Sequence, residues 1–76
     1  ATNGLDDHRT RVGAARRERT RLKLLGSALN VLHRKGAASS VIEDFIAAAG
    51  VSRRTFHNHF ETANELLIAL ATQMSN

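Results

Sequence analysis

The sequence has 76 residues, 42% of them hydrophobic, with a formal net charge of +4 and no cysteine. A chain of this length forms one small domain that buries only roughly 60% of its extended surface, and without cysteine it has neither a disulfide bridge nor a thiolate metal site. No apolar run approaches the roughly 18 residues of a membrane-spanning helix and no hydrophobic signal segment opens the chain, so we expect a cytoplasmic protein without a membrane partner.

Residues 1–14 are expected to form a flexible basic arm, because they show no sustained apolar period and contain Gly4 and Gly13. Positive charge is concentrated between residues 9 and 23, where seven bases stand against the single acid Glu18. Such a block predicts binding to a polyanion, whereas the alternative is a solvated tail. The arm residues predicted to contact that partner are Arg9, Arg11, Arg16, Arg17 and Arg19.

A first helix is predicted over residues 15–35, where leucines recur at intervals of three and four. Gly36 follows Arg34 and Lys35, which is typical of a helix end. Gly26 lies inside this helix and is interpreted as a point where another helix approaches closely. The predicted apolar stripe consists of Leu22, Leu25, Leu29 and Leu32, widened by Ala28 and Val31.

The second helix is predicted to begin with a capping box, in which the Ser40 side chain accepts from the Glu43 amide and Glu43 reaches back to Ser40. It runs to about residue 48 and Gly50 ends it. Its inward-facing residues are expected to be Ile42, Phe45, Ile46 and Ala49.

A third, short helix is predicted over residues 53–59. Ser52 is its N-cap, and Val51 and Phe56 have the spacing of a hydrophobic staple, which fixes the angle at which the chain enters a helix.

The fourth helix is predicted over residues 63–76 and begins with a second capping box, formed by Thr62 and Glu65. Its apolar face consists of Leu66, Leu67, Leu70 and Met74, and is broader than so small a domain requires. The chain has no proline and no segment with a β period, so the fold is predicted to be all-α.

The second and third helices have the arrangement of a helix-turn-helix, in which two helices joined by a short glycine-containing turn offer the second helix to the major groove of DNA. The third helix has little to bury except Phe56 and Phe60. Its other side chains can form hydrogen bonds: arginine binds guanine in a bidentate manner, and asparagine binds adenine. The predicted base-reading residues are Arg53, Arg54 and Asn58.

Residues 24–67 resemble the N-terminal DNA-binding domain of the TetR family of bacterial regulators. The resemblance implies a homeodomain-like bundle of three helices (residues 15–62), followed by a fourth helix that leads to a C-terminal domain for dimerisation and ligand binding. It also implies a homodimer on a palindromic operator that represses transcription until a small-molecule effector binds, and a fragment of this size can be a monomer. The motifs that carry it are Ala28-Leu29, Val31-Leu32, Gly36, the segment 40–46, Ala49-Gly50-Val51-Ser52, Thr55-Phe56, His59-Phe60 and Glu65-Leu66.

By position in this family, five residues are expected to bind DNA phosphates: Ser40, Ser52, Thr55, His57 and His59. The chain also departs from the usual family pattern. Ala37 replaces an aromatic residue, Ile46 an alanine, His57 a tyrosine and Ala63 a phosphate-binding lysine. Arg54 stands where many members have a small residue, so it is expected to add a base contact or to compensate for the missing lysine.

Other function classes fit the sequence less well. His57 and His59 point about 200° apart on a helix, so they cannot share a metal ion, and no catalytic group or cofactor is expected. Binding to a membrane surface is disfavoured, because the N-terminal basic segment lacks the bulky apolar residues that such binding needs. The remaining alternative is a helical interaction module that docks a protein through the face from Leu66 to Met74.

Overall fold

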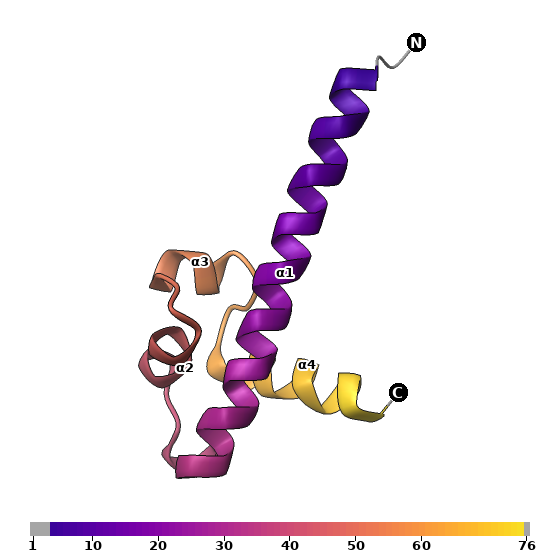
Figure 1. Ribbon diagram of the computed structural model, residues 1–76. Helices are drawn as coiled ribbons and strands as arrows, with labels where there is room; N and C mark the ends of the chain where they lie inside the picture. Colours follow the sequence, from indigo (N-terminus) through magenta and orange to yellow (C-terminus); the bar gives the residue numbers. More distant parts are fainter. Residues whose placement is uncertain (1–3, 76) are drawn as a thin grey trace.

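The computed structural model describes the backbone of residues 4–75 and the side chains of residues 13–75. This part of the chain contains no strand, which confirms the all-α prediction. Figure 1 shows a long helix whose lower half is flanked by the other three, so that the fold measures 51 Å along its longest axis. The elements are α1 (Gly4–Lys35), the 3-10 helix η1 (Ala37–Ser39), α2 (Ile42–Ala49), α3 (Arg53–His57) and α4 (Ala63–Ser75).

The N-terminal segment is the first correction to the sequence-based expectation. Helix α1 begins at Gly4 rather than near residue 15, so the backbone expected to be a flexible arm is helical from Gly4 onward. No other helix runs beside this part of the α1 backbone (Figure 1), so an apolar period is not a condition for it to be helical. Arginine and alanine are both strong helix formers, and Gly13 alone costs only about 1 kcal/mol. The side chains of Arg9 and Arg11 lie outside the described residues.

The buried face of α1 is also rotated from the predicted stripe. Leu22 and Leu29 are nearly half exposed, whereas Leu24, which lies outside that stripe, is fully buried. Leucines occur on more than one side of this helix, so only its contacts with α2 and α4 decide which row faces inward. The core consists of Leu24, Leu25, Ala28, Val31, Phe45, Ala49, Phe56, Phe60, Leu66 and Leu70.

The start of α2 is capped one residue later than predicted. The Ser40 hydroxyl donates to the Gly36 carbonyl at 2.6 Å instead of receiving the Glu43 amide. Val41 is the N-cap residue, and its backbone N–H donates to the Asp44 carboxylate at 3.0 Å. The predicted capping box of Ser40 and Glu43 is therefore wrong, because η1 turns the serine back toward the end of α1.

Asp44 links this helix start to α1, since its other carboxylate oxygen accepts from Lys35 Nζ at 3.0 Å. The Val41 amide, followed by Lys35, lowers the pKa of Asp44 from its ordinary value of 3.8. A carboxylate whose pKa is depressed in the folded state stabilises the fold at pH values above its unfolded-state pKa. This stabilisation is lost as pH falls through its folded-state pKa.

We therefore expect Asp44→Asn to lower the melting temperature at neutral pH, by a difference that shrinks as pH falls below 3.8. Thermal unfolding across this range checks it, with exposed Glu61→Gln as the control; a difference independent of pH would contradict it.

The turn between α2 and α3 has the predicted form. Gly50 adopts a left-handed conformation with φ 69° and ψ 36°, and its N–H donates to the Ile46 carbonyl at 2.9 Å. Ser52 caps α3, as its Oγ accepts from the Thr55 amide at 3.1 Å. Helix α3 ends at His57 rather than at residue 59, so Asn58 is its C-cap residue and His59 lies in the following turn.

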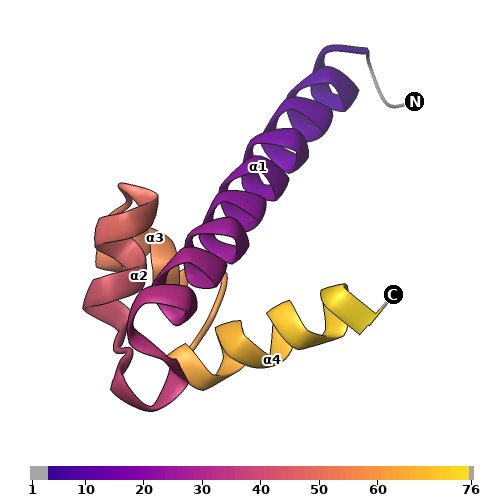
Figure 2. The same cartoon turned by 60° about the horizontal axis from the view of Figure 1, so that its bottom comes forward.

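Helix α4 begins after Thr62, whose Oγ1 accepts from the Glu65 amide at 3.1 Å, as the sequence predicts. Leu66 and Leu70 are buried against the core, while Ile68 and Met74 are 57% and 68% exposed. Figure 2 shows α4 diverging from α1 toward the C-terminus. None of the helices among the described residues is long and apolar enough to cross a membrane.

Gly26 does not mark a close helix contact, because a methyl group added at this position would meet no atom within 4 Å. We expect Gly26→Ala to stabilise the domain by about 0.5–1 kcal/mol, since alanine favours a helix interior. Gly50→Ala is the control and should lose roughly 1–2 kcal/mol, because an L side chain is strained at φ 69°. Urea unfolding monitored by circular dichroism checks both. If both substitutions changed the free energy of unfolding equally and in the same direction, the different roles given to Gly26 and Gly50 would be refuted.

Candidate nucleic-acid interface

Helix α3 is attached to the core by two aromatic rings and is otherwise polar. Phe56 is fully buried and Phe60 nearly so, with their ring centroids 5.8 Å apart. All three predicted base-reading residues are exposed: Arg53 and Arg54 in the first turn of the helix, and Asn58 at its end. The helix thus turns its apolar side inward and presents hydrogen-bonding groups to solvent over its whole length.

The hydroxyl groups at the start of α3 are ordered by each other. Ser52 Oγ donates to Thr55 Oγ1 at 3.0 Å while it accepts from the Thr55 amide. Both residues are predicted phosphate contacts, and this geometry fixes their side chains before any ligand arrives. Ser40 is half-buried and lies before α2, where its proton is already donated to Gly36. Its predicted phosphate contact would therefore require a rearranged hydroxyl.

Glu43 is a residue of this surface that sequence reasoning missed. Its carboxylate forms an ion pair with the Arg53 guanidinium, which joins α2 to α3. The sequence offered only a weak signal, because an acid in the first turn of a helix is expected in any case. Both side chains of this pair are exposed to solvent. An exposed ion pair contributes little to stability, so its main effect is to orient Arg53.

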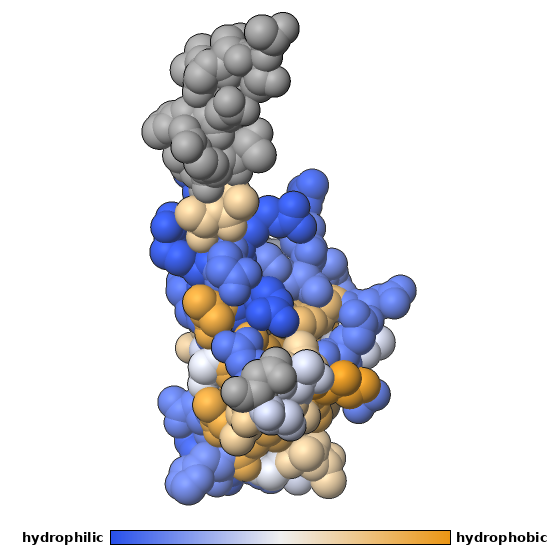
Figure 3. Space-filling view, turned by 90° about the vertical axis from the view of Figure 1, so that its right-hand side faces the viewer, coloured by the Kyte–Doolittle hydropathy of each residue, from blue (hydrophilic) through white to orange (hydrophobic). Residues whose placement is uncertain are grey.

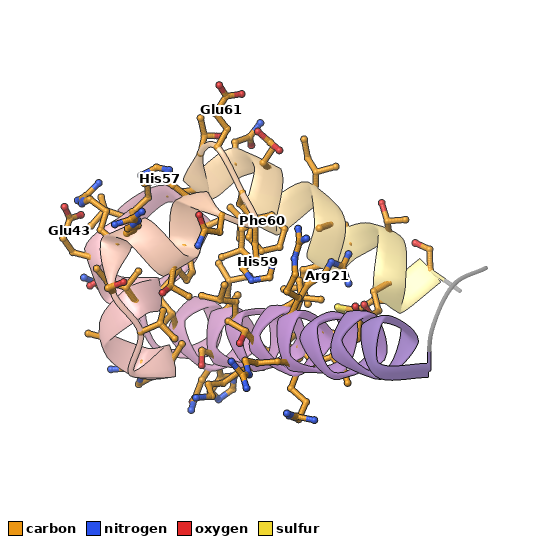
Figure 4. All side chains as sticks on the ribbon, turned by 90° about the horizontal axis from the view of Figure 1, so that it is seen from above. Arg21, Glu43, His57, His59, Phe60 and Glu61 are labelled. Atoms are coloured by element: carbon orange, nitrogen blue, oxygen red, sulfur yellow. The ribbon has the colours of Figure 1, made fainter. Side chains whose placement is uncertain are left out.

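The two histidines of this region lie on different sides of α3. In Figure 4, His57 points outward on the side of Glu43, whereas His59 points toward α1 and lies beside Arg21. His57 is exposed and His59 partly buried. Desolvation, followed by the charges of Arg17 and Arg21, lowers the pKa of His59 from its ordinary value of 6.5. The two predicted phosphate contacts therefore stand in chemically different surroundings.

A hollow lies between α1 and the end of α3, lined by Arg17, Asn58 and His59. The structure thus brings together a predicted arm residue, a predicted base reader and a predicted phosphate contact. Arg53 and Arg54 lie at the other end of α3.

The helical backbone of α1 divides the basic residues into two groups. Arg17 and Arg21 are four residues apart and share the helix side that faces His59. Arg16, Arg19 and Lys23 are also spaced by three and four but lie about half a turn away. Arg21 is not among the predicted contacts, and its spacing from Arg17 is the signal that could have identified it. In Figure 3, hydrophilic residues gather along α1 above apolar patches beside α4.

Within residues 13–75, no three histidine, aspartate or glutamate side chains gather closely enough to hold a metal ion. The groups that do gather are guanidinium, imidazole, amide and hydroxyl groups. These donate hydrogen bonds to phosphate oxygens and to the edges of bases.

Comparisons with known proteins identify a family and a relative of this chain. The family described as bacterial regulatory proteins, tetR family, matches residues 24–70. The HTH-type transcriptional regulator CymR of Pseudomonas putida is 48% identical over 59 residues, which are 78% of this chain and 29% of that protein. This chain therefore spans less than a third of that relative, and no solved structure matches it significantly. Because the family match covers more than half of the sequence, the chain belongs to the TetR family of bacterial transcriptional regulators and comprises its helical DNA-binding domain.

Proposed function

We propose that this domain binds double-stranded DNA in a sequence-specific manner, with α3 in the major groove of an operator half-site. The observation that carries the proposal is the contrast between the two sides of α3, with Phe56 buried and Arg53, Arg54 and Asn58 exposed. Arginine recognises guanine and asparagine recognises adenine through paired hydrogen bonds, so these three side chains are the proposed base readers. In this proposal the domain acts by binding rather than by catalysis.

The proposed phosphate contacts surround α3 and fix its position on the duplex. They are Ser40, Ser52, Thr55, His57 and His59. The arm residues Arg9, Arg11, Arg16, Arg17 and Arg19 are proposed to contact the DNA backbone or the adjacent minor groove. Phosphate contacts of this kind supply affinity and register but carry no sequence information.

We further propose that the whole protein acts as a homodimeric repressor on a palindromic operator in the bacterial cytoplasm, at the nucleoid. In this proposal a small-molecule effector binds outside the present domain, which alone is a monomer that pairs on DNA. The relative is described as a transcriptional regulator, which supports regulation without fixing its direction.

Selection of bound sequences from a random duplex pool tests the proposal. We expect enrichment of a palindrome whose half-sites lie about one helical turn, or a multiple of it, apart. No enrichment over the input pool would overturn sequence-specific binding, and a single unpaired half-site would overturn the dimeric arrangement.

The helical course of α1 predicts an unequal contribution from its arginines. Replacing Arg17 and Arg21 together with glutamine should reduce the slope of log affinity against log salt by about 0.9 for each phosphate that the domain no longer neutralises. The matched pair Arg16 and Arg19 removes the same charge from the other side of α1, so its effect should be smaller. Fluorescence anisotropy at several salt concentrations measures both slopes. If both pairs of substitutions reduced the slope equally, the two sides of α1 would contribute equally to DNA binding.

A second candidate function rests on the exposed apolar residues Ile68 and Met74 of α4. They favour a role of this face in docking a protein. If a pull-down recovered a protein partner while DNA binding stayed at background, this alternative would replace the first.

A further inference from the structure

The hollow between α1 and the end of α3 contains more positive charge than fold stability requires. Arg17, Asn58 and His59 line it, and Arg21 lies beside His59 (Figure 4). No buried polar side chain among the described residues demands these groups, since the core beside them is entirely apolar. The hollow is therefore lined by hydrogen-bond donors that no group of the core requires as partners.

The chemistry of these groups selects an anion with several oxygen acceptors. The Arg17 guanidinium supplies charge and a planar pair of donors, Arg21 adds positive charge near His59, and the His59 imidazole supplies a further donor. The acid that influences His59 is Glu18, and its carboxylate lies 3.9 Å from Arg21 in an exposed, weak pair. An oxygen-rich anion competes with this carboxylate easily, and a backbone phosphodiester is the anion that a duplex on α3 would bring.

His59 differs from the other groups because its charge is variable near neutral pH. In the free domain, burial and the two arginines favour its neutral form and lower its pKa. The charged and titratable groups that face it are Arg17, Arg21 and Glu18, all from α1. A phosphodiester in the hollow reverses the balance, because its negative charge offsets the arginines and stabilises a protonated imidazole.

We propose that this hollow binds one phosphodiester group of the DNA, and that His59 takes up a proton when the group enters. This inference rests on the proposed DNA-binding function. Its consequence is that the domain holds DNA more tightly in mildly acidic than in mildly alkaline solution, through a contact independent of base sequence.

The sign and size of the effect follow from linkage. Since the bound state holds the proton more firmly than the free state, affinity rises as pH falls through the pKa of His59 in the complex. The rise levels off below the pKa of His59 in the free domain. The full change in the dissociation constant is about tenfold for each unit by which the bound pKa exceeds the free one.

His33 provides the matched control. It is an exposed histidine in the last turn of α1 and is not among the proposed DNA contacts, so its replacement leaves the proposed coupling intact. His33→Gln and His59→Gln each remove one histidine. A third variant, Arg17→Gln, retains His59 but removes one of the two charges that disfavour its protonated form.

The experiment measures the pKa of each histidine by NMR, in the free domain, with inorganic phosphate and with a mixed-sequence duplex. Dissociation constants are measured in parallel between about pH 5 and 8. We expect the pKa of His59 to rise with the duplex and with phosphate, and the pH dependence of affinity to persist in His33→Gln but to diminish in His59→Gln. Arg17→Gln should raise the pKa of His59 before any ligand is added.

The outcomes separate this inference from the proposed function. DNA binding with an unchanged His59 pKa, or with a pH dependence that is undiminished in His59→Gln, overturns the inference and leaves the function standing. Absence of DNA binding at every pH overturns the function, and the phosphate titration then still decides whether the hollow binds an anion. Should His59→Gln fail to fold, the response of His59 in Arg17→Gln carries the test.

Discussion

Replacing Phe56 with alanine is expected to destabilise the domain by about 3–5 kcal/mol, because it leaves a cavity under the main anchor of α3. The Phe56 ring is fully buried, and it packs edge-on to His57 at 5.3 Å as well as against Phe60. Small domains have only roughly 0.05–0.15 kcal/mol of stability per residue. The loss is therefore comparable to the whole stability of this chain, and urea unfolding should show a largely unfolded variant.

The control for this prediction is Phe56→Leu, which retains most of the buried volume and should lose considerably less. DNA binding of the leucine variant can then be measured on a folded domain. If the alanine variant unfolded at the same urea concentration as the parent chain, α3 would be held by contacts other than this ring, and its presentation to DNA would need another explanation.

The second large effect concerns recognition. Arg53→Ala and Asn58→Ala should each weaken binding to the selected operator by about 1–3 kcal/mol and relax preference at one base position. Each paired hydrogen bond to a base edge contributes discrimination of this size, and neither side chain is needed by the core. Binding to a series of operators with single-base changes measures the loss and identifies the position.

Matched variants separate base recognition from a general loss of charge or of hydrogen-bonding groups. Arg34→Ala and Asn30→Ala remove the same side chains from exposed positions near the end of α1, away from α3 (Figure 1). They should leave the base preference unchanged. A uniform loss for all operators in Arg53→Ala would instead assign that residue to the phosphate backbone.

The number and order of the helices could be predicted from the sequence because their ends carry strong local signals. Gly36, Gly50, Ser52 and Thr62 each act through neighbouring backbone groups, and the structure confirms each of these ends. The predictions fail where the structure depends on contacts between residues far apart in the sequence, or on the absence of such contacts. The predicted start of α1 is wrong because a helix that no other helix covers needs no apolar period, and the predicted capping role of Ser40 is wrong because η1 redirects its hydroxyl.

The sequence predicts which types of residue form the candidate interface, but not how they are arranged in space. The polar positions of α3 follow from the pattern around Phe56 and Phe60. The meeting of Arg17 with His59 could not be foreseen, because these residues are far apart in sequence and their proximity depends on how α1 packs against the end of α3. Glu43 was missed for a related reason, since its partner lies on the next helix.

The ion pair between Glu43 and Arg53 has a consequence for selectivity. If Arg53 reads a base as proposed, it must first leave this carboxylate, and the free energy of leaving is the same for every duplex. A site with a well-placed guanine replaces the lost partner, whereas an unrelated sequence does not. Because this cost is the same everywhere, it does not itself separate one sequence from another; it means that Arg53 is released only where a base binds the guanidinium more strongly than Glu43 does.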